Sequence, residues 1–293
     1  MRPGITVLIL ALGLGFPALW HGPVAVQAAA AEKASPQEAP TAKMEKLVAS
    51  VRDRLNDYQQ EELQIEAHSL RAQQAAMQGL KEPAKVADLI AKGQLTSDLR
   101  AYRNTILACA REWSGFQQRF AGLERSIKGL TADRPGAPAD LQGEIDALVT
   151  RFEQKSRGLQ MKVGELYERV AEYRSALAIY MAFYKEIPED KRAAERTLQE
   201  KIADVSEKCG DNATALNIVK GLFEARPEKD RFKDTKLGER LGRLYEKIGD
   251  LRTALTVYKG TYEGIPAASR AKQGAAIAKK IAELEKKASG QKK

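Results

Sequence analysis

The sequence contains few residues of the kinds that carry out chemistry. Among its 293 residues there are two histidines, His21 and His68, and two cysteines, Cys109 and Cys209. This scarcity excludes a histidine-rich metal site, a zinc ribbon and a framework of disulfide bonds. The sequence also lacks the glycine-rich phosphate loop, the G-x-S-x-G turn of serine hydrolases and the H-E-x-x-H helix of metalloproteases. We therefore expect no cofactor, no metal and no enzymatic activity.

Aromatic residues are scarce as well, at 6% of the chain. The composition is 43% apolar and 30% charged, and Ala, Leu, Glu, Lys and Arg dominate it. This balance favours helices over the β-branched and aromatic strands of a sandwich or barrel. The composition therefore predicts an all-α fold.

The first residues have the layout of a secretory signal peptide. Arg2 precedes an apolar run over residues 5–20, and the V-Q-A sequence that ends at Ala28 supplies small residues for cleavage. We expect residues 1–28 to be removed on export. The polar, proline-bearing residues 29–42 are predicted to form a disordered lead before the fold.

An uncleaved membrane anchor is the alternative reading of this leader. A spanning helix needs about 20 apolar residues, and the H-G-P sequence at 21–23 interrupts the run before that length is reached. No later segment has the apolar length to cross a bilayer. We therefore expect an exported, periplasmic protein without an integral membrane span after cleavage.

A long-helix region is predicted over residues 43–156. Between residues 99 and 130 apolar side chains recur at spacings of three and four, which predicts one amphipathic helix that is capped at Ser97-Asp98 and ends near Thr131. Such a stripe must be covered by other helices. The stripe consists of Leu99, Tyr102, Ile106, Cys109, Trp113, Phe116, Phe120, Leu123, Ile127 and Leu130.

Two further long helices are predicted beside it, over residues 42–79 and from Ala139 onward. The first is expected to change register near Glu62 and to point Met44, Val48, Val51, Leu55, Tyr58, Leu63, Ile65, Leu70 and Met77 inward. The inward residues of the second are Leu141, Ile145, Leu148, Phe152, Leu159 and Val163. Three long helices with tight connections favour an antiparallel bundle within one chain, but the same stripes could join two or three chains as a coiled coil.

The second half of the sequence repeats with a period of 39 residues. Ala176, Ala215 and Ala254 are related by this step, and each of three prolines is followed four residues later by an arginine. Six sets share the period: Gly164, Ala203 and Gly242; Tyr167, Ser206 and Tyr245; Val170, Cys209 and Ile248; Tyr180, Val219 and Tyr258; Pro188, Pro227 and Pro266; Arg192, Arg231 and Arg270. A fixed period over so many positions indicates a repeat architecture.

This pattern resembles the tetratricopeptide repeat. The family's small, aromatic, alanine, aromatic and proline positions match Gly164, Tyr167, Ala176, Tyr180 and Pro188. Two periods further on, they match Gly242, Tyr245, Ala254, Tyr258 and Pro266. The middle unit departs from the pattern, with Ser and Val where aromatics are usual. The period also exceeds the usual length of about 34 residues, from which we infer an extra turn at the start of each first helix.

The resemblance implies three helical hairpins and a capping helix over residues 157–288, followed by a disordered tail at 289–293. The capping helix, at 267–288, is expected to bury Ile277, Ile281 and Leu284. The whole layout is weakly similar to periplasmic envelope proteins that join a coiled coil to such repeats. The expected fold class is thus all-α, with a long antiparallel bundle or coiled coil followed by an α-solenoid.

Stacked repeats imply a concave groove lined by their first helices, and a groove of this kind binds a protein or peptide partner. The acidic first two units and the mixed third unit predict a partner segment with a basic stretch followed by an acidic group or a free carboxylate. The predicted groove residues are Met161, Glu165, Glu168, Thr197, Glu200, Asp204, Glu207, Lys236, Glu239, Arg243 and Glu246.

We therefore expect an exported scaffold or adaptor within a cell-envelope assembly. One alternative is a structural spacer that forms homo-oligomers through its long helices. Another follows from the charge: essentially the whole net charge of +9 arises in residues 231–293, and this basic end could bind an anionic polymer or a membrane surface. Nucleic acid is not expected as a ligand, because no aromatics are interspersed with the lysines of 272–293. Cys109 and Cys209 are most simply packing residues, although export leaves a disulfide between them open.

Overall fold

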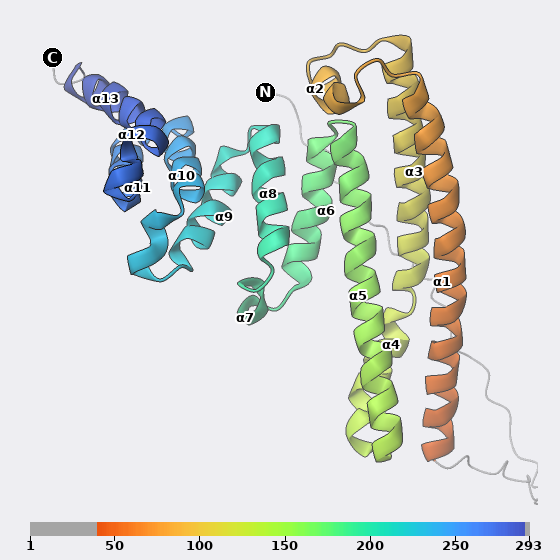
Figure 1. Ribbon diagram of the computed structural model, residues 1–293. Helices are drawn as coiled ribbons and strands as arrows, with labels where there is room; N and C mark the ends of the chain where they lie inside the picture. Colours follow the sequence, from red (N-terminus) through yellow and green to blue (C-terminus); the bar gives the residue numbers. More distant parts are fainter. Residues whose placement is uncertain (1–39, 291–293) are drawn as a thin grey trace, which may run out of the picture. The chain divides into compact units, whose positions relative to one another are not determined.

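The computed structural model describes residues 40–290, and every regular element within this range is a helix (Figure 1). The expected all-α class is confirmed for this part of the chain. The predicted leader, 1–28, lies outside the described residues, as do residues 29–39 of the predicted lead and 291–293 of the predicted tail. None of the described helices is long and apolar enough to cross a membrane.

Three long helical segments make up the first half of the described chain. They follow one another with short helices between them, and the first begins at Pro40, within the segment that was expected to precede the fold. The elements are α1 (Pro40–Gln78), η1 (Pro83–Lys85), α2 (Val86–Ala91), α3 (Ser97–Ala121), α4 (Glu124–Asp133), η2 (Arg134–Gly136) and α5 (Ala139–Arg169).

Side-chain pairs give the directions of these helices. Arg52 of α1 binds Glu144 of α5, 92 residues along the chain, and Lys162 of α5 donates to Glu66 of α1, 96 residues away. Because this separation stays nearly constant, α1 and α5 run parallel.

The separation between α1 and α3 changes instead. The Tyr58 hydroxyl donates to the carbonyl oxygen of Arg119, 61 residues away, whereas the Cys109 thiol lies 4.0 Å from the carbonyl oxygen of Ser69, only 40 residues away. A separation that falls as α1 advances means that α3 runs antiparallel to α1. The three segments therefore form an up-down-up bundle within one chain.

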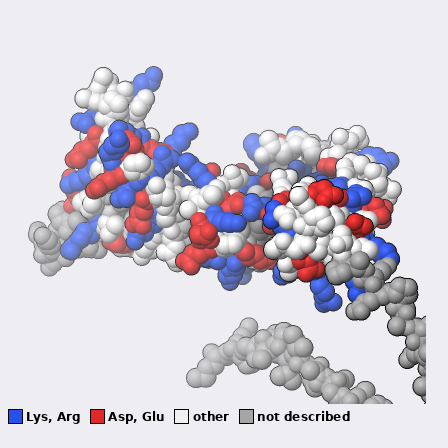
Figure 2. Space-filling model, turned by 90° about the horizontal axis from the view of Figure 1, so that it is seen from below, with Lys and Arg blue, Asp and Glu red and all other residues white. Residues whose placement is uncertain are grey.

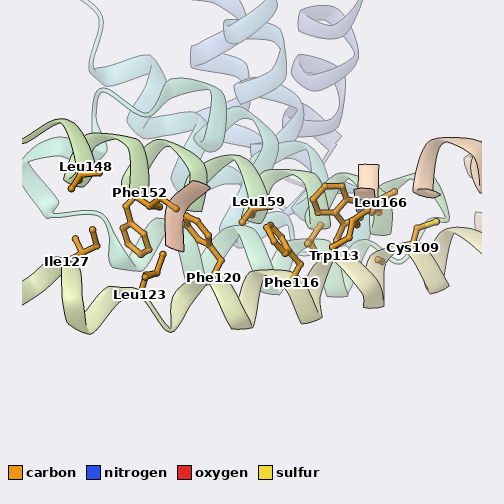
Figure 3. Packing of buried hydrophobic residues seen from close by; sticks show 14 of the residues in the cluster. Cys109, Trp113, Phe116, Phe120, Leu123, Ile127, Leu148, Phe152, Leu159 and Leu166 are labelled. Carbon is orange, nitrogen blue, oxygen red and sulfur yellow. The ribbon is translucent and has the colours of Figure 1, made fainter. Parts of the chain in front are cut away.

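The core of this bundle consists of the predicted α3 and α4 stripe packed against α1 and α5, and Figure 3 shows its contact with α5. Trp113 is 1% exposed and Phe116 is fully buried, and Phe120 stacks on Phe152 of α5 with ring centroids 5.1 Å apart. Every residue of the predicted stripe from Leu99 to Leu130 is buried. The heptad pattern thus identified this face of the bundle correctly.

The prediction of one continuous helix over residues 99–130 was wrong. The helix is interrupted between α3 and α4, where Gly122 N–H bonds to the carbonyl of Arg119 and Leu123 N–H to that of Phe120. These are three-residue steps in place of the four-residue steps of an α-helix, and glycine makes such a local departure cheap. Leu123 nevertheless stays fully buried, so the break leaves the buried stripe intact.

The predicted inward face of α1 was also partly wrong in its second half, where Ile65 alone of the predicted residues is buried. Leu63, Leu70 and Met77 are exposed, whereas Ser69 and Gln73 are buried. The buried positions continue the spacing of the first half without a slip near Glu62, but polar side chains occupy several of them. The buried positions of α1 are therefore evenly spaced along the helix, but the residues at these positions are apolar in some cases and polar in others.

Helical hairpins with the predicted period follow the bundle. Second helices begin at residues 173, 212 and 251, and first helices begin at 196 and 235, in steps of 39 residues. The first helix of the first hairpin is the C-terminal part of α5, which continues through Leu159 without a break. The remaining long elements are α6 (Tyr173–Glu186), α8 (Arg196–Cys209), α9 (Asn212–Glu224), α10 (Thr235–Lys247), α11 (Leu251–Gly264) and α13 (Ala275–Gly290).

The extra residues of each period do not lengthen the first helices, which corrects the sequence expectation. They form a separate turn of helix after each proline, because proline ends the second helix and starts a new one. These short elements are α7 (Glu189–Arg192), η3 (Glu228–Lys233), η4 (Ala267–Ser269) and α12 (Arg270–Gln273). The elements η4 and α12 replace the start of the predicted 267–288 capping helix. In α13, which forms the rest of it, Ile277 and Leu284 are buried as expected.

The periodic arginine closes the end of each second helix. The Nε of Arg231 donates to the carbonyl of Arg226 at 3.1 Å, and its Nη2 donates to the carbonyl of Glu224 at the same distance. Arg192 and Arg270 make the equivalent pairs of bonds. The last carbonyls of a helix have no partner within it, so this side chain stabilises each C-terminus.

The turn between the two helices of each hairpin requires a left-handed residue. Gly210 and Gly249 have φ angles of 79° and 87°, and the equivalent residue of the first hairpin, Ala171, has a φ of 56°. The three N–H groups bond to the carbonyls three residues earlier in the same way. Ala171 thus adopts a conformation that costs a non-glycine residue about 1–2 kcal/mol.

We predict that Ala171→Gly stabilises the protein. Removing the Cβ relieves the left-handed strain, and the gain exceeds the greater unfolded-state entropy of glycine by about 0.5–1 kcal/mol. Urea denaturation measures the change in the free energy of unfolding. The control, Ala178→Gly in the exposed interior of α6, should lower stability by about 1 kcal/mol. A loss of stability in both variants would contradict the left-handed turn at Ala171.

Candidate partner-binding groove

The first helices of the hairpins are held against their second helices by small residues. A Cβ added to Gly164 would lie 2.2 Å from the Tyr180 ring, and one added to Gly242 would lie 2.7 Å from the Tyr258 ring. The middle hairpin has Ala203 at this position, in a cluster with the smaller Val219. The glycine and the tyrosine therefore occur together because the ring needs the space that the missing side chain leaves.

Each of these tyrosines also orients a glutamate on the first helix. The Tyr180 hydroxyl donates to Glu168 at 2.8 Å, and the Tyr258 hydroxyl donates to Glu246 at 2.7 Å. Burial, with the carboxylate as a further cause, raises the pKa of both tyrosines. The middle hairpin has valine in place of the tyrosine, so its equivalent glutamate, Glu207, is held in another way.

Neighbouring first helices are joined by ion pairs that recur with the repeat. Glu168 of α5 lies 3.4 Å from Lys201 of α8, and Glu246 of α10 lies 3.5 Å from Lys280 of α13. In each pair the earlier helix supplies the acid and the later helix supplies the base. α13 therefore occupies the place of the next first helix, beside α10.

Glu207 forms the most extensive of these pairs. Arg240 donates to it at 2.7 Å, Lys247 at 3.1 Å and Arg243 at 3.3 Å, all three from α10. The Glu207 side chain is only 12% exposed. Burial alone would raise the pKa of this carboxyl, but the hydrogen bonds from Arg240 and Lys247 outweigh it and hold the pKa below its ordinary value of 4.5.

The acids that were predicted to line the groove are thus largely neutralised within the chain. Glu165 lies 3.2 Å from Lys201, Asp204 lies 2.6 Å from Arg240, and Glu200 pairs with a base on its own helix. On the face shown in Figure 2, basic and acidic side chains are interspersed. Met161 is half-buried among the core residues of the first hairpin, and Thr197 and Lys236 are exposed.

The sequence analysis missed the bases that neutralise these acids. Lys201 and Arg240 occupy the same position one period apart, as do Lys208 and Lys247. The 39-residue period alone would therefore have identified them as a recurring feature. Lys280 does not follow this register, because α13 packs with a shifted pattern of buried residues.

A groove with a volume of about 550 Å³ lies between α10 and α13. Its lining combines three of the predicted residues, Glu239, Arg243 and Glu246, with charged side chains of α13. The apolar part is formed by Tyr258, Ala276 and Ile277, and the remaining lining residues are Lys247, Lys279, Lys280 and Glu283. The groove thus offers four basic groups and three acidic groups above an apolar floor.

The described residues hold no group of three or more His, Cys, Asp or Glu side chains that could bind a metal ion. His68 is exposed and lies 3.0 Å from Glu112. Cys109 and Cys209 are free thiols, the first buried and the second half-buried, so no disulfide joins them. Burial raises the pKa of the Cys209 thiol, which makes it a weaker nucleophile at neutral pH.

We predict that Glu207→Gln lowers stability by about 1–2 kcal/mol at neutral pH, because it removes a charge that three bases share. A carboxyl with a lowered pKa in the folded state contributes stability above its ordinary pKa of 4.5. The difference between wild type and variant should therefore shrink as the pH falls below 4.5, measured by urea denaturation across the pH range.

The matched control is Glu224→Gln, because Glu224 forms only an exposed ion pair with Lys220. Surface pairs of this kind contribute at most about 1 kcal/mol. A pH-independent cost of Glu207→Gln would show that the carboxylate charge is not the source of the stabilisation.

Comparison with known proteins gives no family for this chain. No family model matches the sequence, and no curated protein matches it. The features of this chain that favour a binding face are the repeat period, the ion pairs between first helices and the groove between α10 and α13.

Proposed function

We propose that this protein is an exported, non-enzymatic scaffold or adaptor that binds a segment of a protein partner along its first helices. In this proposal the hairpins act as tetratricopeptide-like repeats, and the protein works in the periplasm as part of a cell-envelope assembly. The observation that carries it is the groove between α10 and α13, which combines an apolar floor with exposed charges. Ligands bind preferentially in concave sites, and protein interfaces combine an apolar centre with a polar rim.

The charges suggest how such a segment would lie. The acids of the first two hairpins already have basic partners, so they are less available to a basic peptide than the sequence suggested. Within residues 40–290, no ion pair holds Lys279 of the groove, and Arg243 and Lys247 share the single carboxylate of Glu207. The acidic part of a partner would therefore bind at α10 and α13, with apolar side chains against Tyr258 and Ile277.

The experiment compares capture of partners from an envelope extract by wild type and by the double variant Lys236→Glu, Lys279→Glu, which changes one predicted groove residue of α10 and one lining residue of α13. Both lysines are exposed, and neither joins two helices by an ion pair in the described part of the chain, so the fold should be unaffected. The control, Lys185→Glu with Lys272→Glu, makes the same change in net charge away from the groove. We predict about tenfold less captured partner for the groove variant and no change for the control.

Two outcomes would contradict the proposal. Equal capture by wild type and groove variant would remove the groove as the binding site. Equal loss in both double variants would show that net charge alone attracts the captured material. Circular dichroism of each variant checks that its helices are intact.

A further inference from the structure

The outer face of α1 carries a line of exposed apolar side chains. Leu63, Leu70 and Met77 are 54%, 50% and 42% exposed. Residues seven positions apart lie on one side of a helix, so the three form a single stripe. Only two other large apolar residues in the described part of the chain are comparably exposed, Leu95 and Ile248. Three of the five exposed large apolar residues in the described part of the chain therefore lie in this one stripe.

We propose that this stripe is the contact between two copies of the chain, which pair their α1 helices antiparallel about a twofold axis at Leu70. Leu70 lies midway between the other two residues of the stripe. A twofold axis there brings Leu70 against its own copy and Leu63 against Met77 of the second copy. The stripe thus complements itself, as a symmetric dimer interface must.

The charges beside the stripe allow an identical surface to approach. Glu66 is bound by Lys162 at 2.8 Å, His68 lies 3.0 Å from Glu112, and Arg71 donates to a carbonyl oxygen of its own helix. The ionic groups on this part of α1 are thus engaged within the chain. The stripe itself carries no charged residue, and the centres of interfaces are depleted of charged residues in general.

A recess beside the stripe can receive a side chain of the second helix. It has a volume of about 150 Å³, lies between α1 and α5, and includes Leu70 in its lining. Trp113 and Leu166 supply further apolar wall, and the remaining lining residues are polar or charged: Glu66, Ser69, Gln73, Lys162, Glu165 and Arg169. A side chain from one helix that inserts between residues of its partner is the normal packing of paired helices.

This dimer contact is independent of the proposed groove, which lies on α10 and α13. Its test is sedimentation velocity of the purified chain at concentrations up to about 100 µM. We expect a concentration-dependent equilibrium between monomer and dimer. Leu70→Asp should weaken the dimer at least about tenfold, because it places two like charges at the axis. Ile248→Asp, which alters an exposed apolar residue that follows α10, should leave the dimer unchanged.

A second pair of variants tests the antiparallel register and does not depend on Leu70→Asp folding normally. Leu63→Lys alone should weaken the dimer, and adding Met77→Glu should restore it, because the two altered residues meet across the axis. A chain that stays monomeric at every concentration overturns the proposal. So does a dimer that survives Leu70→Asp with its helices intact, or one that Met77→Glu fails to rescue.

Discussion

Helix α5 packs against two sets of neighbours at once, and the rest of the structure depends on this. Its N-terminal half buries Ile145 and Phe152 in the bundle with α1, α3 and α4. Its C-terminal part is the first helix of the first hairpin, where Gly164 admits the Tyr180 ring of α6. Because α5 is continuous through Leu159, no linker separates the predicted regions 43–156 and 157–288. The long helices and the repeats share one backbone element and one compact unit from Pro40 onward.

A common pattern of charge accompanies this shared element. Toward the C-terminal end of α1, as between successive first helices of the hairpins, acids on the earlier helix bind bases on the later one, whereas Arg52 and Glu144 pair in the opposite order. Glu66 with Lys162 and Glu207 with Arg240 are examples from the two regions. The antiparallel helices α3, α6, α9 and α11 lie between the parallel ones in both regions, as the packing in Figure 1 shows. The bundle is thus organised like an additional hairpin with longer helices, placed before the three that the sequence period reveals.

Much of this fold was predictable, because its regularities are local in the sequence. The spacing around Trp113 and Phe120 predicted a buried stripe, and the recurrence of Ala176 and Pro188 predicted the hairpins. The register of α1 was not predictable from hydrophobicity, since Ser69 is buried and Leu70 is exposed. Which of the two faces of α1 meets α3 and α5 is decided by long-range packing, and a hydrophobic pattern cannot reveal that when polar residues occupy the inner face.

The candidate groove was predictable only in part for a related reason. The period located the first helices, and with them Glu239 and Arg243. The ion pairs that neutralise the acidic side chains join residues about 35 positions apart, and they exist only because the helices lie side by side. The floor at Ile277 depends on where α13 packs, which no repeat of the sequence encodes. Sequence therefore identifies the face, and the structure identifies which charges on that face remain available.

The continuity of α5 is the central claim, and hydrogen exchange measures it directly. If one helix belongs to both regions, its amides from Ile145 to Leu166 should exchange slowly and with similar protection. The two halves of a single packed helix open together, so no segment between them exchanges faster than the rest. A rapidly exchanging segment around Leu159, between two protected halves, would show a joint in the helix. That result would separate the bundle from the repeats and contradict a single helix shared by both.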